Sequence, residues 1–436
     1  MIDRIETAEI RLWKQLVAAV SWQDDRGYAV FEYDPKFLRS GLDISPLHMS
    51  LDAAESGDGL FAFPELAKRT YLGLPGLLAD ALPDKYGRSI IDAWLTRQGR
   101  DPDSFSPVER LCYTAGRAMG ALEFAPSVHA RKEKAVPIEV SELVALAQEI
   151  VNERQGLTAQ LGTSEDAAAI QDILSVGTSA GGARPKAIIA VNDQGHVVSG
   201  QTNVPPGYDH WILKFDGVTD IELGEPKEFG RIEFAYYHMA TQAGIEMMPC
   251  RLLEEGGRAH FMTRRFDRVD GQKVHMQSLC GLAHFDFNEP GLYSYEQALM
   301  VMRKLRLSKQ EAAQQFRRMV FNVVATNLDD HTKNIAFLMD REGHWTLSPA
   351  FDVTYAYNPA GQWANQHQMS INGKRKGLER EDLIAVGKSI SLSKPGKVID
   401  EVVDAVSEWP RYAKLAGVSP SIIRNRGAHH RLDVAA

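Results

Sequence analysis

A cluster of polar residues in the last third of the chain has the types and spacing that phosphoryl transfer requires. Its members are Asp329, Asp330, His331, Lys333 and Asn334, and Asp352 follows them after a pattern of two short apolar strands. Mg²⁺ prefers hard oxygen ligands, so Asn334 and Asp352, which converge from two adjacent loops, are predicted to bind this ion. Asp329 is then placed to orient a hydroxyl and accept its proton. Taken alone, the cluster also fits a solvated surface loop.

A second candidate is the segment "SVGTSAGGARPKAIIAV", residues 175–191, in which serine and glycine residues stand directly before a predicted strand. The backbone N–H groups of such a loop can approach a phosphate, and Arg184 and Lys186 would add positive charge. The simpler alternative is a tight turn that serves only the strand.

Lys214, within the apolar run "HWILKF", must either extend its ammonium to solvent or meet an anion. Glu233, early in a predicted helix, could hold it as an ion pair. The two residues fit a structural salt bridge as well as a catalytic clamp. A metal-dependent phosphoesterase built on Asp329, Asp330 and His331 is a rival interpretation, but it leaves Lys214 and the glycine-rich segment without a role.

Strands and helices are predicted around these candidates. "YAVFEY", "HWILKF" and "AHFMTRRFD" are expected to be strands, and "KAIIAV" and "HVVSG" a hairpin across "NDQG". Two short helices are expected on either side of Pro83 and Asp84. Further helices should begin at Ser141 as N-cap, run from Ile232 to Ala243, and contain the apolar stripe of "AAQQFRRMVFNVVATN". The charged link "ARKEKAVP", residues 130–137, is the predicted domain boundary.

Composition excludes several classes of protein. With 436 residues the chain is too long for one core, and 44% hydrophobic with 24% charged residues is typical of a globular protein. Three isolated cysteines fit neither a zinc site nor a disulfide framework, and no run of about 18 apolar residues suits a membrane span. We therefore expect a cytoplasmic protein without membrane contact. A net charge of −8 does not favour direct binding to nucleic acid.

Together these motifs resemble the HipA-like serine/threonine kinases, the toxins of bacterial type II toxin-antitoxin modules, over nearly the whole chain. "LLADALPDKYGRSIIDAWL" and "AGRAMGALEFAP" resemble the amino-terminal signature of that family. "SAGGARPKAIIAV", "HWILKF", "RRFDR" and "NLDDHTKNIAFL" with "LSPAFDV" resemble its kinase core in the same order.

The resemblance implies an α+β fold with a two-lobed kinase-like core and an extra amino-terminal α/β subdomain. Residues 1–130 would form the subdomain, 131–266 the strand-rich N-lobe with the glycine-rich loop and hinge, and 267–436 an all-helical C-lobe. ATP and Mg²⁺ are the implied cofactors. Asp329 would be the catalytic base, Asn334 and Asp352 the metal ligands, and Ser179 the site of autophosphorylation.

Lys214 would contact the α- and β-phosphates and Arg264 to Phe266 would form the adenine hinge. The full set implied for ATP binding is Ser179, Ala180, Gly181, Gly182, Lys186, Lys214, Glu233, Arg264, Phe266, His331 and Lys333. Asp330 stands where the family often has glycine, and its carboxylate would either join the metal site or face solvent. Ser175 and Thr178 are rival acceptors to Ser179.

The resemblance also implies partners. A small helix-turn-helix antitoxin would hold the toxin inactive, and DNA would be bound only through that antitoxin, in agreement with the acidic charge. The protein substrate would lie in translation, for example an aminoacyl-tRNA synthetase. The alternative is a catalytically silent kinase-like scaffold that binds an antitoxin and co-represses its operon.

Overall fold

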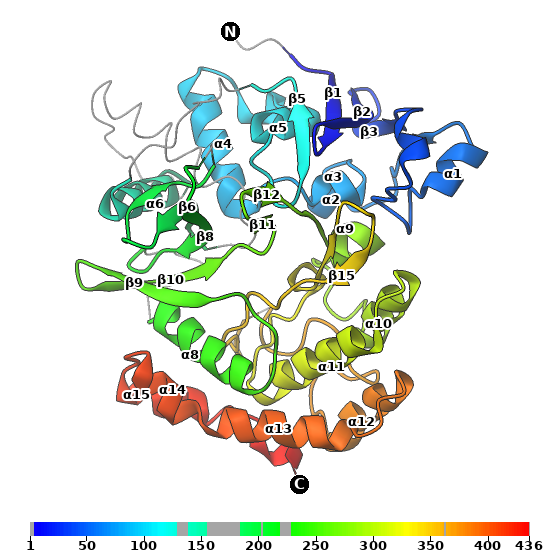
Figure 1. Cartoon of the computed structure of the whole chain (residues 1–436). Helices are drawn as coiled ribbons and strands as arrows, with labels where there is room; N and C mark the ends of the chain where they lie inside the picture. Colours follow the sequence, from blue (N-terminus) through cyan, green and yellow to red (C-terminus); the bar gives the residue numbers. More distant parts are fainter. Residues whose placement is uncertain are drawn as a thin grey trace. The chain divides into compact units, whose positions relative to one another are not determined.

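The computed structural model describes residues 4–128, 138–154, 184–201, 204–218, 228–361 and 363–435. The chain forms two compact units (Figure 1). The first contains residues 1–227, 251–276 and 340–343, and the second contains residues 228–250, 277–339 and 344–436. The predicted link "ARKEKAVP", residues 130–137, lies outside the described residues. Ser179 to Gly182 lie outside them as well.

Five strands of the first unit form an antiparallel sheet in the order β4-β3-β2-β1-β5. They are β1 (Thr7–Leu12), β2 (Gln15–Gln23), β3 (Tyr28–Tyr33), β4 (Leu60–Phe61) and β5 (Leu122–Ala125). Along β1, Ala8 and Ile10 are buried while Thr7 and Glu9 are exposed, which is the alternation of a sheet with one buried face. The prediction of "YAVFEY" as a strand is confirmed by β3.

Short helices accompany this sheet: α1 (Leu51–Ser56), α2 (Lys68–Tyr71), α3 (Gly76–Ala79), α4 (Lys85–Arg97) and α5 (Pro107–Thr114). The predicted break at Pro83 and Asp84 is confirmed, because α3 and α4 flank it. Asp84 is the N-cap of α4, and its Oδ1 accepts a hydrogen bond from the Gly87 backbone N–H at 2.8 Å.

A second sheet of the first unit has the order β7-β6-β8-β10-β9. Its strands are β6 (Lys186–Asn192), β7 (Val197–Ser199), β8 (Tyr208–Lys214), β9 (Cys250–Glu255) and β10 (Arg258–Arg264). The predicted hairpin is confirmed, since β6 and β7 pair antiparallel with Val191 opposite Val197. Gly195 takes a φ of +82° in the turn, a conformation that L side chains rarely adopt.

Helix α6 (Val140–Arg154) covers one face of this second sheet. Its Leu143 and Val144 share a buried apolar cluster with Ile189 and Leu213. The prediction of Ser141 as N-cap is wrong, because the helix begins at Val140 and Ser141 is its second residue. Val140 belongs to the same buried cluster, so packing draws the helix start one residue further back than the capping signal indicates.

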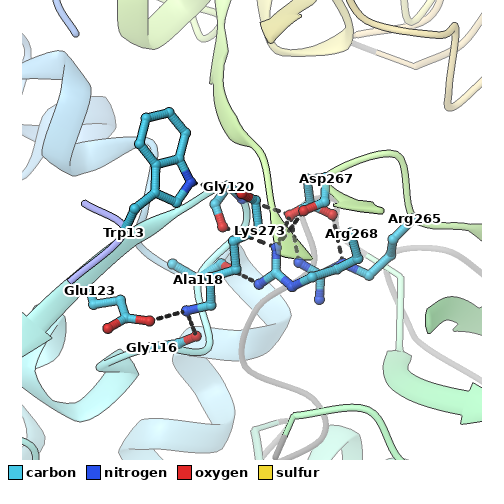
Figure 2. A network of polar contacts seen from close by, with 9 residues as sticks. All are labelled: Trp13, Gly116, Ala118, Gly120, Glu123, Arg265, Asp267, Arg268 and Lys273. Carbon is cyan, nitrogen blue, oxygen red and sulfur yellow. Dashed lines mark hydrogen bonds and ion pairs between the residues drawn. The ribbon is translucent and has the colours of Figure 1, made fainter. Parts of the chain in front are cut away.

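A buried ionic cluster joins the loop before β5 to the chain that follows β10 (Figure 2). We call Arg265, Asp267, Arg268 and Gly120 the Asp267 cluster. Asp267 is fully buried, receives hydrogen bonds from Arg265 Nε and Nη2 at 2.8 and 2.7 Å, and from Arg268 Nη1 at 2.7 Å. The Gly120 N–H donates to the same carboxylate at 2.7 Å. One carboxylate therefore holds two cations and a backbone amide together.

The hairpin β11 (Arg268–Val269) and β12 (Gln272–Lys273) extends this connection. Lys273 Nζ donates to Glu123 Oε1 at 2.7 Å and to the Gly116 carbonyl at 2.6 Å, and Trp13 Nε1 donates to the Lys273 carbonyl at 2.8 Å (Figure 2). The amino-terminal sheet and the segment after β10 are thus parts of one compact unit.

The second unit is mostly helical (Figure 1). Its helices are α8 (Phe229–Gln242), α9 (Leu279–Ala283), α10 (Tyr295–Lys304), α11 (Lys309–Val324), α12 (Arg380–Ser389), α13 (Pro395–Ser407), α14 (Trp409–Leu415) and α15 (Pro420–Gly427). The predicted apolar stripe is confirmed: Phe316, Met319 and Val320 on α11 are completely buried. The predicted helix 232–243 corresponds to α8, which is followed by Gly244 at a φ of +77°.

Within residues 267–436 the chain is not all-helical as predicted. Besides β11 and β12 it contains β13 (His275–Ser278), β14 (Ala336–Met339) and β15 (Trp345–Leu347), and β14 pairs antiparallel with β15. The apolar runs there are only three or four residues long and are separated by a turn, which is too short for a helix. This hairpin is the strand–turn–strand pattern expected between Asn334 and Asp352.

We predict that Asp267→Asn destabilises the protein by about 3–5 kcal/mol, because Arg265 and Arg268 would remain buried beside each other without a carboxylate. The comparison variant is Glu123→Gln, whose pair with Lys273 is about a quarter exposed and should cost less, about 1–2 kcal/mol, although burial lowers the pKa of Lys273 to about 8. Urea unfolding of both variants measures the difference. Equal losses in the two variants would show that the Asp267 cluster is not the stronger connection.

Candidate active site

The segment from Thr326 to Asn334 leaves the end of α11 and is held in place by the backbone. The Leu328 N–H donates to the Ala356 carbonyl at 2.9 Å, and the Ala356 N–H donates to the Thr326 carbonyl at 3.2 Å. This pairing carries the chain past Asp329, whose side chain is exposed. A short 3₁₀ turn, Thr332–Asn334, then closes the loop before β14.

Asp330 is buried, so the expectation that its carboxylate faces solvent is wrong, and its participation in a metal site stays a prediction. Its side chain is buried and accepts hydrogen bonds from the Tyr295 hydroxyl and the Gln368 N–H, each at 2.8 Å, and pairs with His367 Nδ1 at 2.8 Å. Burial alone would raise the pKa of Asp330, but His367 and these hydrogen bonds outweigh it and lower the pKa below its usual value. Asp330 therefore anchors the loop as a buried carboxylate.

Asn334 is oriented by two hydrogen bonds within the loop. Its Nδ2 donates to the Asp329 carbonyl at 2.9 Å, and its backbone N–H donates to the His331 carbonyl at 2.9 Å. Because the amide nitrogen is used in this way, the Asn334 Oδ1 is turned away from the Asp329 carbonyl. An amide oxygen held in one orientation is a suitable ligand for a hard cation.

Asp352 lies after β15 in a strained backbone conformation, with a φ of +51°. Strain of this kind persists only where neighbouring contacts impose it, and it concentrates at functional sites. Two contacts hold the preceding chain: the Ala350 N–H donates to the Glu246 carbonyl at 2.8 Å, and Arg318 Nη2 donates to the Ser348 carbonyl at 2.7 Å. Burial lowers the pKa of Arg318 to about 10, so its guanidinium stays charged at neutral pH.

Asn334 and Asp352 line the same cavity of the second unit. Four buried polar atoms on residues lining this cavity have no hydrogen-bond partner among the described residues, namely Gln315 Oε1, Arg318 Nε, Asn327 Oδ1 and His331 Nδ1. Unsatisfied buried polar atoms are costly, so a cavity lined by them suits a polar occupant such as water or the hydration shell of a cation. The oxygens of Asn334 and Asp352 fit Mg²⁺.

His331 and Lys333, both predicted near the phosphates, are half-buried beside one aromatic ring. The Lys333 Nζ lies 5.2 Å from the centre of the Phe287 ring, and the His331 ring lies 5.4 Å from it. Phe287 thus restricts both side chains. The motifs did not single out Phe287, Arg318, Tyr295 or His367. Arg318 lies within the run "AAQQFRRMVFNVVATN", but nothing in that run distinguishes a buried arginine from an exposed one.

In the first unit, Lys214 lies at the end of β8, directly opposite Lys186 on β6 and Phe261 on β10. Its Nζ is 5.7 Å from the centre of the Phe261 ring. Lys186 is buried and pairs with Asp84 at 3.1 Å, a contact that the sequence did not indicate. Glu233, on α8 of the second unit, is buried, and its pairing with Lys214 stays a prediction.

The two predicted hinge residues lie at the end of β10. Arg264 Nη2 donates to Asp209 Oδ1 at 2.6 Å, and Phe266 is buried. Between them, Arg265 belongs to the Asp267 cluster and its N–H donates to the His210 carbonyl at 2.9 Å. These contacts hold the segment rigidly in place. Its contact with adenine stays a prediction, as do the roles of Ser179, Ala180, Gly181 and Gly182.

Comparisons with known proteins give the family. The family model for the HipA-like C-terminal domain matches residues 178–409, more than half of the chain, and that for the HipA N-terminal domain matches residues 8–125. The chain therefore belongs to the HipA family, as the motifs indicated. The division at residues 130 and 266 stays a prediction.

Particular relatives agree with this assignment. The solved HipA of Shewanella oneidensis MR-1, from a toxin-antitoxin complex with HipB and operator DNA, is similar with a TM-score of 0.64 and 16% identity, covering 98% of this chain and 96% of that one. A Sinorhizobium fredii protein named "Putative kinase Y4mE" is 24% identical over 247 residues. That match spans 52% of this chain and only 48%, about half, of the relative's length.

A third similarity is to the Helicobacter pylori proinflammatory kinase CtkA, with a TM-score of 0.34 and 12% identity over 52% of this chain and 89% of that one. The predicted fold class, an α+β kinase-like fold with an added amino-terminal part, is confirmed by the mixture of helices and strands and the HipA match. Among the described residues, none of the helices has the length and apolar character of a membrane span.

We predict that Asp330→Asn destabilises the protein by about 1.5–3 kcal/mol at pH 7, since it weakens charge-assisted hydrogen bonds in a buried site. The lowered pKa of Asp330 means that its contribution to stability is present above about pH 4 and is lost as the pH falls further. Urea unfolding between pH 7 and pH 3 should therefore be less pH-dependent in the variant. An unchanged stability with weakened Mg²⁺ binding would instead identify Asp330 as a metal ligand.

Proposed function

We propose that this HipA-family protein is an ATP- and Mg²⁺-dependent serine/threonine protein kinase that acts as a toxin. The observation that carries the proposal is the geometry of one loop. Asp329 is exposed, while Asn334, fixed by a hydrogen bond to the Asp329 carbonyl, lines a polar cavity together with Asp352. A free carboxylate beside two hard oxygen ligands is the arrangement that phosphoryl transfer uses.

In this proposal Asn334 and Asp352 hold Mg²⁺. When bound, the ion neutralises charge on the phosphates of ATP. Asp329 orients the hydroxyl of the substrate serine or threonine and accepts its proton. The hydroxyl oxygen forms a bond to the γ-phosphorus while the bond to the bridging oxygen of ATP breaks, so that ADP leaves with that electron pair.

The remaining residues position the nucleotide. Lys214 contacts the α- and β-phosphates and is aligned by Glu233, and Arg264 and Phe266 lie at the adenine. The segment that contains Ser179 covers the phosphates, and His331 and Lys333 approach them from the catalytic loop. The aromatic ring of Phe287 would keep Lys333 close to that loop.

The surroundings of Asp330 argue against a metal-dependent phosphoesterase. Such a site would use Asp329, Asp330 and His331 together as ligands. The Asp330 carboxylate is instead occupied by Tyr295, His367 and Gln368 inside the second unit. The kinase arrangement needs no metal ligand at Asp330.

We further propose the partners of a toxin of this class, in the cytoplasm. The related Shewanella protein was solved with HipB and operator DNA. A small helix-turn-helix antitoxin would neutralise this chain and would carry it to DNA, which a net charge of −8 disfavours as a direct ligand. The phosphorylated target would lie in translation, for example an aminoacyl-tRNA synthetase.

Incubation with Mg²⁺ and γ-labelled ATP should label the wild-type protein, and Asp329→Ala should reduce the rate by about 10²- to 10⁴-fold through loss of the general base. Asp404→Ala, which removes an exposed carboxylate on α13, is the matched control and should keep the wild-type rate. Labelled peptides are identified by mass spectrometry. Absence of label in the wild type, with nucleotide binding intact, would favour the catalytically silent scaffold that represses with an antitoxin.

We predict that phosphorylation of Ser179 prevents productive ATP binding. The phosphate adds roughly −1.5 to −2 charges to a segment that must otherwise contact the phosphates of ATP. Nucleotide titration of fully phosphorylated protein, beside the Ser179→Ala variant kept unmodified, measures the effect. Unchanged affinity after complete modification would contradict this prediction, and label on Ser175 or Thr178 would reassign the acceptor.

A further inference from the structure

A buried ion pair links the two family domains within the first unit. Lys186 Nζ lies 3.1 Å from Asp84 Oδ2, and the two side chains are only 2% and 8% exposed. Asp84 lies in the segment matched by the HipA N-terminal domain and Lys186 in the segment matched by the HipA-like C-terminal domain. The two charges of such a buried pair depend on each other, because removing one side chain leaves the other charge buried without a counter-ion.

The Asp84 side chain is fixed independently of Lys186. Its Oδ1 caps α4 through the Gly87 N–H at 2.8 Å, which leaves Oδ2 for the lysine. Helix α4 is itself immobilised, because Tyr86, Ile90 and Trp94 belong to a buried apolar cluster. The carboxylate is therefore a rigid anchor and not a mobile surface group.

Lys186 has a second charged neighbour. In the register of the sheet, Lys186 on β6 is directly opposite Lys214 on β8. Directly opposed side chains project to the same face with Cβ atoms about 4.5–5.5 Å apart, and like charges in that position destabilise a sheet. Asp84 supplies the negative charge that makes the pair of lysines tolerable.

We propose that Asp84 is a positioning residue for the nucleotide site, which holds Lys186 as a structural cation and so fixes the place of Lys214. This inference rests on the proposed function, and it assigns Lys186 a different role from that of a phosphate ligand. The amino-terminal domain thereby takes part in ATP binding without touching the nucleotide. Lys214 remains the lysine that contacts the phosphates.

The test is a double-mutant cycle on the full chain with Asp84→Asn, Lys186→Met and the double variant, with affinity for ATP and Mg²⁺ measured by calorimetry. Asparagine keeps the N-cap of α4, so Asp84→Asn removes mainly the charge. We expect each single variant to weaken ATP binding by about tenfold and the double variant to lose little more, as for residues that act as one unit.

The opposite result is equally specific. If Lys186 were a phosphate ligand, Lys186→Met would weaken ATP binding, whereas Asp84→Asn would release the lysine and leave ATP binding unchanged or tighter. That pattern, or losses that simply add in the double variant, would overturn the proposal. Glu123→Gln, which breaks the pair with Lys273, is the matched control and should leave ATP affinity within about twofold.

Failure of the proposed function is seen separately, as wild-type protein that does not bind ATP; the role of Asp84 in nucleotide binding would fall with it. Urea unfolding of the same four proteins reports on the ion pair without any nucleotide. There, losses of stability that do not add in the double variant support a coupled Asp84–Lys186 pair, and additive losses contradict it.

Discussion

The arrangement of the loop from Thr326 to Asn334 depends on the burial of one carboxylate. Asp330 is drawn into the second unit by Tyr295, His367 and Gln368, and its neighbour Asp329 consequently faces solvent. Two adjacent aspartates thus differ in environment, since Asp330 is buried and hydrogen-bonded whereas Asp329 is exposed.

A similar division occurs among the charged residues of the first unit. Arg265 and Arg268 share Asp267, and Lys186 is paired with Asp84. Both carboxylates connect segments that are distant in the sequence. The buried ion pairs of these residues therefore join the amino-terminal part of the first unit to the strands that follow it.

Most secondary structure followed from local signals. The strand-type run at Tyr28–Tyr33 predicted β3, and the break at Pro83 and Asp84 separated α3 from α4, because these features are determined by neighbouring residues. Long-range contacts were not predictable. Asp84 and Lys186 are 102 residues apart and Asp330 and His367 are 37 apart, so no periodicity connects them. For the same reason the sequence did not predict the burial of Asp330 or Lys186.

We propose that Asn334 and Asp352 hold a metal ion on which nucleotide binding depends. Calorimetric titration with a non-hydrolysable ATP analogue, with and without Mg²⁺, tests it directly in the wild type and in Asp352→Asn. We expect binding that Mg²⁺ strengthens in the wild type and a loss of that dependence in the variant. Binding that is equally Mg²⁺-dependent in both proteins, or no binding by the wild type, would contradict it.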